Sequence, residues 1–116
     1  MKRAFVYLPN FDKIWNSLNL SDENLIELEN TILEQPDKGE IIQGAGGLRK
    51  IRAGKDNKGK SGGIRVLYVD FEHYGRTYCL FAYLKNESET ITDQQKKMFK
   101  QKINSLLEEL KKKVKK

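Results

Sequence analysis

The sequence contains few of the side chains that commonly bind metals or act as acid–base catalysts near neutral pH. Its 116 residues include one cysteine, Cys79, and one histidine, His73. One cysteine cannot form a disulfide within the chain, and one cysteine with one histidine cannot supply the four ligands of a structural zinc site. We therefore expect neither a metal nor another cofactor, and we expect His73 to be an exposed turn residue rather than a catalyst.

Long apolar runs are also absent. No stretch reaches the ~18 consecutive apolar residues that a membrane-spanning helix needs. Hydrophobic residues make up 38% of the chain and charged residues 33%, which is typical of a small soluble domain with a charged surface. This length is sufficient for one core but not for two. We expect a single domain over residues 1–116, located in the cytoplasm and without a membrane partner.

Positive charge is in excess and is unevenly distributed along the chain. The 22 Lys and Arg residues outnumber the 16 Asp and Glu residues, which gives a formal net charge of +6. Residues 21–40 carry a net −6, whereas residues 44–66 carry +6 and residues 96–116 carry +7. Such segregation steers a polyanion towards one side of a molecule. The sequence therefore predicts an acidic partner.

The first third of the chain predicts one strand and two helices. Residues 3–8 are rich in β-branched and aromatic side chains, which favour a strand. Apolar residues at helical spacing predict a short helix over 11–18. A second helix is expected over 21–35, because Ser21 is a favourable N-cap and Pro36 ends the apolar period.

The remainder predicts three strands and a last helix. The strands are expected over 48–53, 64–71 and 77–84, with a turn over 72–76. The last strand is nearly continuous in apolar residues, so we expect it to be central. Thr92 and Gln95 have the spacing of a capping box, which predicts a basic C-terminal helix from about residue 93. The expected fold is therefore α+β, in the order β-α-α-β-β-β-α, with an N-terminal helix hairpin packed on a small, mostly antiparallel sheet.

Alternation along these strands brings several cations to one face. Lys50 and Arg52 share a face, whereas Arg49 points the other way. In the last strand Phe81, Tyr83 and Lys85 share a face. If the three strands form a meander, the surface opposite the helix hairpin carries Lys50, Arg52, Arg65, Tyr83 and Lys85. Such a surface suits RNA, because Lys and Arg neutralise phosphates and a Tyr ring can stack on an unpaired base.

Four sequence motifs resemble those of a known family. They are Gly-Ala-Gly-Gly-Leu-Arg-Lys-Ile-Arg at 44–52, Gly-Gly-Ile-Arg-Val-Leu-Tyr at 62–68, Tyr-Leu-Lys-Asn-Glu at 83–87 and Thr-Asp-Gln-Gln-Lys at 92–96. In this order and spacing they resemble the RelE/HigB family of bacterial toxins, and most closely its HigB-like branch. The resemblance covers nearly the whole chain, and the family uses the order of elements expected above.

The resemblance implies the toxin of a type II toxin–antitoxin system. Such toxins are mRNA interferases, endoribonucleases that cut mRNA in the A site of the 30S subunit and so inhibit translation. The ribose 2′-hydroxyl attacks the adjacent phosphate, and the family promotes this step largely with Lys, Arg and sometimes Tyr, without a metal. The implied partners are mRNA on the ribosome and a cognate antitoxin, expected to be a helix-turn-helix protein similar to HigA.

The resemblance also implies roles for individual residues. Lys50 is a candidate for the general base or a phosphate contact, Arg52 for stabilising transition-state charge, and Arg65 for clamping the scissile phosphate. Lys85 is a candidate for protonating the leaving oxygen or holding the RNA. Asn86 stands where the family often has a basic residue, so general base and general acid are left unassigned. The implied RNA-binding residues are Lys55, Lys58, Lys60, Tyr83 and Asn86.

Two other functions fit the same sequence. One is a non-enzymatic nucleic-acid-binding module, or a degenerate toxin-like protein that still pairs with an antitoxin. The other is a structural protein whose basic C-terminal segment docks on an acidic partner. An Arg65→Ala change separates the nuclease from both, because only the nuclease loses an activity.

Overall fold

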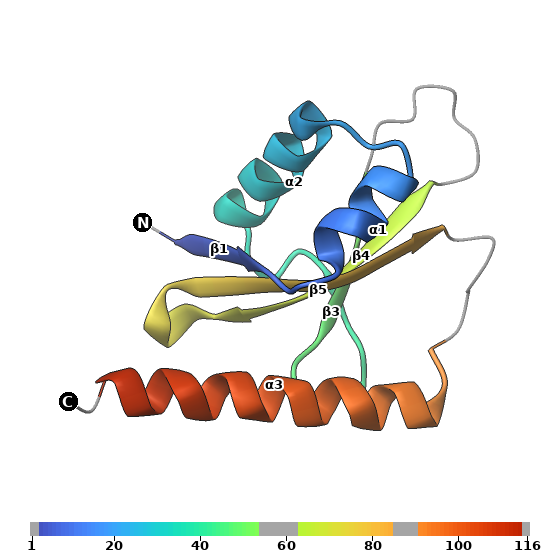
Figure 1. The fold of residues 1–116 in the computed structure, drawn as a ribbon. Coiled ribbons are helices and arrows are strands. Elements are labelled where there is room, and N and C mark those ends of the chain that lie inside the picture. The colour runs from blue at the N-terminus through green and yellow to red at the C-terminus, as the bar shows by residue number, and fades with distance from the viewer. Residues whose placement is uncertain (1–2, 54–62, 85–90, 115–116) are drawn as a thin grey trace.

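The computed structural model describes residues 3–53, 63–84 and 91–114. Three helices and five strands lie in these ranges (Figure 1). Their order is β1 (Ala4–Tyr7), α1 (Phe11–Ser17), α2 (Asp22–Glu34), β2 (Glu40–Ile41), β3 (Arg49–Ala53), β4 (Ile64–Phe71), η1 (Glu72–Tyr74), β5 (Arg76–Leu84) and α3 (Asp93–Val114). The predicted α+β class is confirmed.

The strands form one mixed sheet in the order β1-β5-β4-β3-β2. β3, β4 and β5 form the predicted antiparallel meander. β1 adds to β5 in parallel, and β2 pairs with β3 at the other edge. The middle strand is β4, so β5 is an interior strand but not the central one.

The predicted order of elements needs one correction. β2 adds a fifth strand of two residues, and the predicted turn contains the 3₁₀ helix η1. Two residues are too few to show a period in sequence, and β2 is a strand only because it pairs with β3. The order of helices and strands is therefore β-α-α-β-β-β-β-α, with η1 between the last two strands.

The helices cover both faces of the sheet. α1 and α2 lie on one face, and α3 runs across the other (Figure 1). α2 begins at a capping box in which Ser21 Oγ accepts from Asn24 N at 3.1 Å and Asn24 Oδ1 accepts from Ser21 N at 3.0 Å. The predicted capping box of Thr92 and Gln95 is confirmed by two reciprocal bonds of 2.9 and 3.1 Å. None of the helices in the described ranges is both long and apolar enough to cross a membrane.

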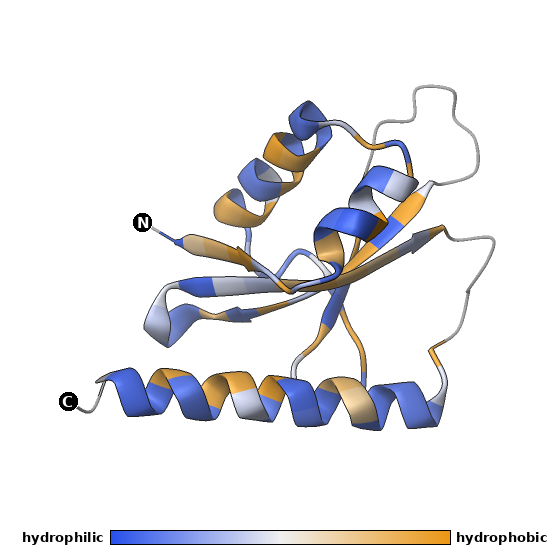
Figure 2. Cartoon of the chain, in the orientation of Figure 1, coloured by the Kyte–Doolittle hydropathy of each residue, from blue (hydrophilic) through white to orange (hydrophobic). Residues whose placement is uncertain are grey.

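Two hydrophobic clusters fill the spaces between the sheet and its helices. On the α1–α2 side, Phe11 and Trp15 pack with Leu28 and Ile32 against the sheet. On the α3 side, the buried helix residues are Ile103, Leu106 and Leu110. Figure 2 shows the apolar side of α3 turned towards the sheet. This second cluster also includes Ala45 and Leu48, so the glycine-rich segment before β3 packs with α3.

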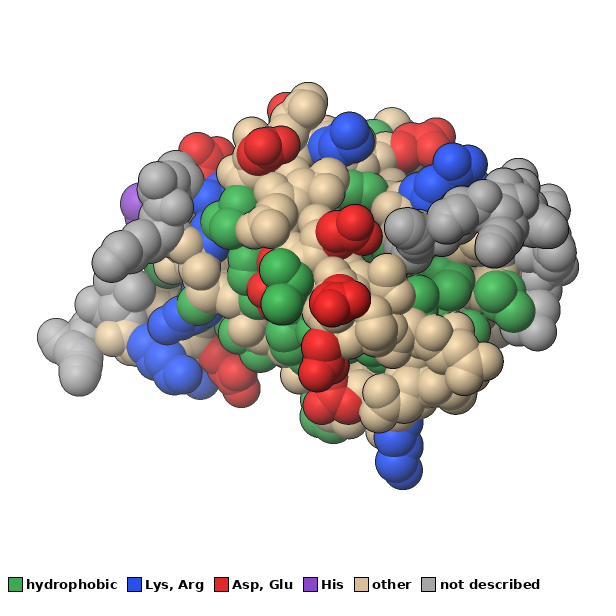
Figure 3. All heavy atoms as spheres, turned by 90° about the horizontal axis from the view of Figure 1, so that it is seen from above, with side chains coloured by type: hydrophobic (Ala, Val, Ile, Leu, Met, Phe, Trp, Pro, Cys, Tyr) green, Lys and Arg blue, Asp and Glu red, His purple; other side chains and the backbone are tan. Residues whose placement is uncertain are grey.

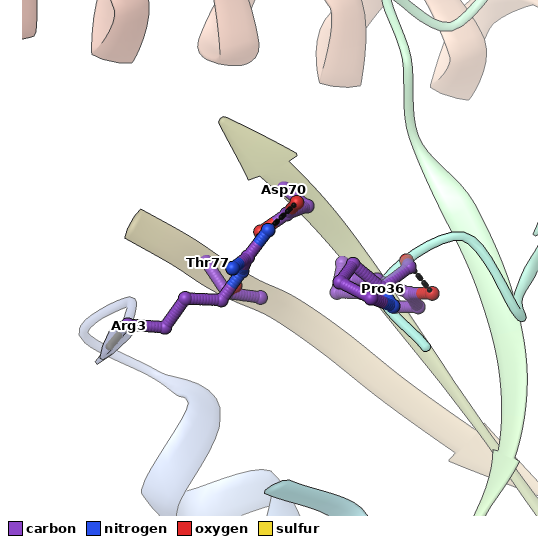
Figure 4. A network of polar contacts seen from close by, with 5 residues as sticks. Arg3, Pro36, Asp70 and Thr77 are labelled. Atoms are coloured by element: carbon purple, nitrogen blue, oxygen red, sulfur yellow. Dashed lines mark hydrogen bonds and ion pairs between the residues drawn. The ribbon is translucent and has the colours of Figure 1, made fainter. Parts of the chain in front are cut away.

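A buried ion pair fixes the start of β1 to the sheet (Figure 4). Arg3 donates two hydrogen bonds to the Asp70 carboxylate, of 2.8 and 2.9 Å, and Thr77 Oγ1 donates a third of 2.7 Å. The hydrogen bonds from Arg3 to Asp70 raise the pKa of the Arg3 guanidinium. Nearby, the Tyr68 hydroxyl donates to Pro36 O at 2.8 Å and accepts from Gly39 N at 3.0 Å. The Arg3–Asp70 ion pair and the Tyr68 hydroxyl both lie away from the end of the sheet at which Ile64 pairs with Leu84.

Candidate functional site

Strand pairing brings four of the predicted site residues together on the α3 face of the sheet. Arg52 lies directly opposite Arg65, and Arg65 lies directly opposite Tyr83. Directly paired residues share a face. Tyr83 packs in the α3-side cluster, whereas Ile51 and Ala53 pack in the α1–α2 cluster. Arg52, Arg65 and Tyr83 therefore form one row across three strands.

Lys50 extends this row into a broader basic surface. It lies two residues from Arg52 on the same face of β3, a separation of about 7 Å along a strand. Lys50 and Arg65 are half-buried and Arg52 is exposed. We call Lys50, Arg52 and Arg65 the cationic face.

The two arginines of the cationic face occupy directly opposite positions on β3 and β4. Like charges directly opposite each other on adjacent strands destabilise a sheet. An anion that contacts both guanidinium groups removes this repulsion and gains charge-assisted hydrogen bonds. The pairing of Arg52 with Arg65 therefore forms a site suited to a phosphate group.

The opposite side of the molecule has a different electrostatic character. Figure 3 shows the side that carries α1 and α2, where acidic side chains gather along its middle. Arg49 points to this side, as predicted, and donates hydrogen bonds of 2.7 Å to Gly39 O and 3.3 Å to Asp37 O. Its guanidinium holds the segment before β2 and is not part of the cationic face.

Tyr83 is more enclosed than a stacking residue usually is. Its exposed fraction is 8%, whereas that of Phe81 is 38%. Burial raises the pKa of the Tyr83 hydroxyl, and the positive charge of Arg65 lowers it by a smaller amount. The hydroxyl is therefore protonated at neutral pH and can donate a hydrogen bond.

Two residues contribute to this site that sequence reasoning did not assign to it. Glu40 lies directly opposite Lys50 in the β2–β3 pair, so it brings a carboxylate to the same face. No sequence signal indicated this, because β2 has only two residues. Phe81 was placed on the face of Tyr83 by alternation but was given no role, and its exposure could not be read from the sequence.

Other predicted residues fall elsewhere. Lys55, Lys58, Lys60, Lys85 and Asn86 lie outside the described residues. His73 is exposed, as expected. It lies in η1, which follows the end of β4, whereas Arg65 lies near the start of that strand. At the rise of a strand, the two residues are about 20 Å apart.

Burial raises the pKa of the Cys79 thiol to about 12, so this group is not ionised at neutral pH. Within the described ranges, no three His, Cys, Asp or Glu side chains are arranged to hold a metal ion.

The amino-acid sequence matches the model of a known protein family. A family model described as the RelE toxin of the RelE/RelB toxin–antitoxin system matches residues 4–116. The match includes every helix and strand of the fold and all residues of the cationic face.

Proposed function

Because the chain belongs to the RelE toxin family and is thus the toxin of a toxin–antitoxin system, we propose that it is a ribosome-dependent endoribonuclease. Its substrate is mRNA in the A site of the 30S subunit, and cleavage there inhibits translation. The protein acts in the cytoplasm, where its substrate is found. An antitoxin is the partner that the family implies.

The observation that carries this proposal is the direct pairing of Arg52 with Arg65 on the cationic face. Attack of a ribose 2′-hydroxyl on the adjacent phosphorus forms a 2′,3′-cyclic phosphate and expels the 5′-oxygen of the next nucleotide. Negative charge accumulates on the non-bridging oxygens during this step. Guanidinium groups on directly paired residues can both approach these oxygens and stabilise the charge, and we propose that the reaction proceeds without a metal ion.

The proton transfers fall to neighbouring residues. Lys50, about 7 Å from Arg52 along β3, is proposed to contact the 2′-hydroxyl or the phosphate next to it. The leaving 5′-oxygen needs a proton, and we assign that step to Lys85, which follows β5 in sequence. Lys55, Lys58, Lys60 and Asn86 are proposed to hold RNA around the cleaved bond.

The sequence of the β3 segment supports a narrower assignment. The run Gly-Gly-Leu-Arg-Lys-Ile-Arg at 46–52 resembles the HigB-like branch of the family. We therefore propose a helix-turn-helix antitoxin similar to HigA.

The test is cleavage of an mRNA on ribosomes with an empty A site, using wild type and Arg65→Gln. Loss of one preorganised cation at a developing anion is expected to slow cleavage by about 100-fold or more. Arg76→Gln is the matched control, because Arg76 begins β5 at the other end of the sheet and should leave the rate unchanged. The same mRNA without ribosomes should remain uncut.

Three results would count against the proposal. Wild-type rates for Arg65→Gln would remove the assigned role of the cationic face. Equal cleavage of free and ribosome-bound mRNA would remove the dependence on ribosomes. An intact mRNA after incubation with a wild-type protein that still binds it would favour the degenerate, non-enzymatic alternative.

A further inference from the structure

The strands in the described ranges contain two acidic residues, and one of them lies beside the cationic face. Glu40 is directly opposite Lys50 in the β2–β3 pair, so the two side chains share a face of the sheet. The other acid, Asp70, follows Val69, which packs in the α3-side cluster, so alternation turns Asp70 towards α1 and α2. Among the described strand residues, Glu40 alone therefore brings a carboxylate to the face proposed to bind RNA.

The Glu40 carboxylate is available to a ligand. Glu40 is exposed, and none of the ion pairs within residues 3–53, 63–84 and 91–114 includes it. A carboxylate repels nearby phosphates, so Glu40 does not strengthen the binding of RNA. Its place next to the phosphate site is explained by a part in the chemical step instead.

The residue before Glu40 is fixed through both of its backbone groups. Gly39 N donates to the Tyr68 hydroxyl at 3.0 Å, and Gly39 O accepts from Arg49 at 2.7 Å. Tyr68 is fully buried. A Cβ at position 39 would lie 2.8 Å from both the ring and the hydroxyl of Tyr68, so the absence of a side chain allows this close approach. The start of β2 is therefore held in place.

The residue after β2 is anchored as well. Ile42 N donates to Leu48 O at 2.9 Å, and both side chains pack in the α3-side cluster. Glu40 therefore stands between two fixed points, although β2 itself has only two residues. A group that is held in place before the substrate binds costs no reorganisation during the reaction, which is the property that a catalytic residue needs.

The separation of Glu40 from the phosphate site suits two ends of one reaction. Arg52 is the diagonal neighbour of Glu40, two residues beyond its direct partner Lys50. Side chains in such diagonal positions start about 7–8 Å apart, a gap that long side chains bridge. The attacking 2′-oxygen comes within about 3–3.5 Å of the phosphorus before the bond forms. A nucleotide whose phosphate contacts Arg52 and Arg65 can therefore place its 2′-hydroxyl at the Glu40 carboxylate.

A carboxylate is also a better base than a lysine at neutral pH. Unperturbed Glu side chains have a pKa of about 4.3, and unperturbed Lys side chains have a pKa of about 10.4. A carboxylate is thus ready to accept a proton, whereas an ammonium group must first lose one.

We infer that Glu40 is the general base of the cleavage reaction and that Lys50 contacts the phosphate. The inference rests on the proposed function and assigns one of its two proton transfers. A Glu40 carboxylate oxygen takes the proton of the 2′-hydroxyl as the bond from the 2′-oxygen to phosphorus forms. The bond from phosphorus to the 5′-oxygen breaks, and the general acid, assigned above to Lys85, protonates that oxygen. Glu40 then releases its proton to water.

The first test is single-turnover cleavage by Glu40→Gln of mRNA on ribosomes with an empty A site. The amide keeps the shape of the side chain but does not accept the proton, so cleavage should slow by roughly 100- to 10,000-fold. Binding to ribosomes whose mRNA has a 2′-deoxy sugar at the scissile nucleotide should not weaken, which also shows that the variant folds. Glu23→Gln is the matched control, because Glu23 is exposed on α2, across the sheet, and should behave as wild type.

The dependence of the rate on pH separates a base from a residue that only supports the structure. With a carboxylate as base, wild-type cleavage should change little between about pH 6 and pH 8, because carboxylates are ionised throughout this range. In Glu40→Gln the proton must go to hydroxide or to a deprotonated lysine, so the rate should rise about tenfold per pH unit. Glu40→Asp keeps the carboxylate and should keep the flat profile at a lower rate.

Four results would overturn the inference. A wild-type rate for Glu40→Gln would show that Glu40 takes no proton. An equal loss at every pH would assign Glu40 a structural role. A tenfold rise per pH unit in the wild type would assign the base to a lysine, and in each of these three cases the nuclease function would stand. No cleavage of intact mRNA by the wild-type protein would refute the proposed function and this inference with it.

Discussion

Arg52 and Arg65 are held opposite each other by the backbone of β3 and β4, although their charges repel. Like charges directly opposite each other on adjacent strands cost a sheet a fraction of a kcal/mol up to about 1 kcal/mol. Because the repulsion disappears when a phosphate lies between the two side chains, the same pair that weakens the free protein strengthens its complex with RNA. Stability and function therefore depend in opposite ways on these residues.

A variant that removes one of these charges should separate the two effects. Arg52→Gln is expected to raise the free energy of unfolding by a few tenths of a kcal/mol at low salt, because it ends the repulsion. The gain should shrink in 0.5 M salt, which screens exposed charges. Urea unfolding at two salt concentrations measures this, with Lys13→Gln, a change at an exposed residue of α1, as the control. A loss of stability at low salt would contradict the unfavourable pairing.

At the scale of elements, sequence reasoning predicted most of the fold. The alternating and helical periods placed β4 at residues 64–71, and the capping box placed the start of α3 at Asp93. Alternation also placed Lys50, Arg52, Arg65 and Tyr83 on one face. These features depend on local pattern, which a single chain displays directly.

Other elements could not be predicted because they depend on contacts remote in sequence. β2 is a strand only through its partner. Leu80 is an extra residue in β5, because Leu67 pairs with Phe81 and Tyr68 with Cys79, and only the register with β4 defines this bulge. The apolar stripe of α3 predicts burial but not the face of the sheet that it covers.

The glycine-rich segment before β3 packs against α3, and two of its glycines separate conformational effects from packing effects. Gly44 and Gly46 have φ of +81° and +72°, a region that costs other residues about 1–2 kcal/mol. A Cβ at Gly46 would lie 3.2 and 3.3 Å from Cγ and Cα of Lys100 on α3, whereas at Gly44 it would meet nothing within 4 Å. A side chain at position 46 would therefore press on Lys100, and α3 would have to move by a few tenths of an ångström.

We predict that Gly46→Ala destabilises the protein more than Gly44→Ala does. Both variants should lose about 1–2 kcal/mol through backbone strain, and Gly46→Ala should lose about 1 kcal/mol more because α3 must shift. Urea unfolding of both variants measures the difference. Equal losses would show that this segment does not position α3.

At the scale of the whole molecule, the charge asymmetry of the sequence becomes an asymmetry between two faces. The net −6 of residues 21–40 includes the acids of α2, which lie on the side shown in Figure 3. The cationic face lies on the other side of the sheet, with α3 and its lysines. A polyanion is therefore steered to the face that carries Arg52 and Arg65.

The central claim is that this face cleaves RNA by attack of the ribose 2′-hydroxyl, and a single atom of the substrate tests it. The measurement is cleavage of an mRNA on ribosomes in which only the scissile nucleotide has a 2′-deoxy sugar, beside the unmodified mRNA. We predict that the 2′-deoxy mRNA binds but remains intact, and that the unmodified mRNA yields a 5′ fragment ending in a 2′,3′-cyclic phosphate. Cleavage of both mRNAs at the same position and rate would contradict the account.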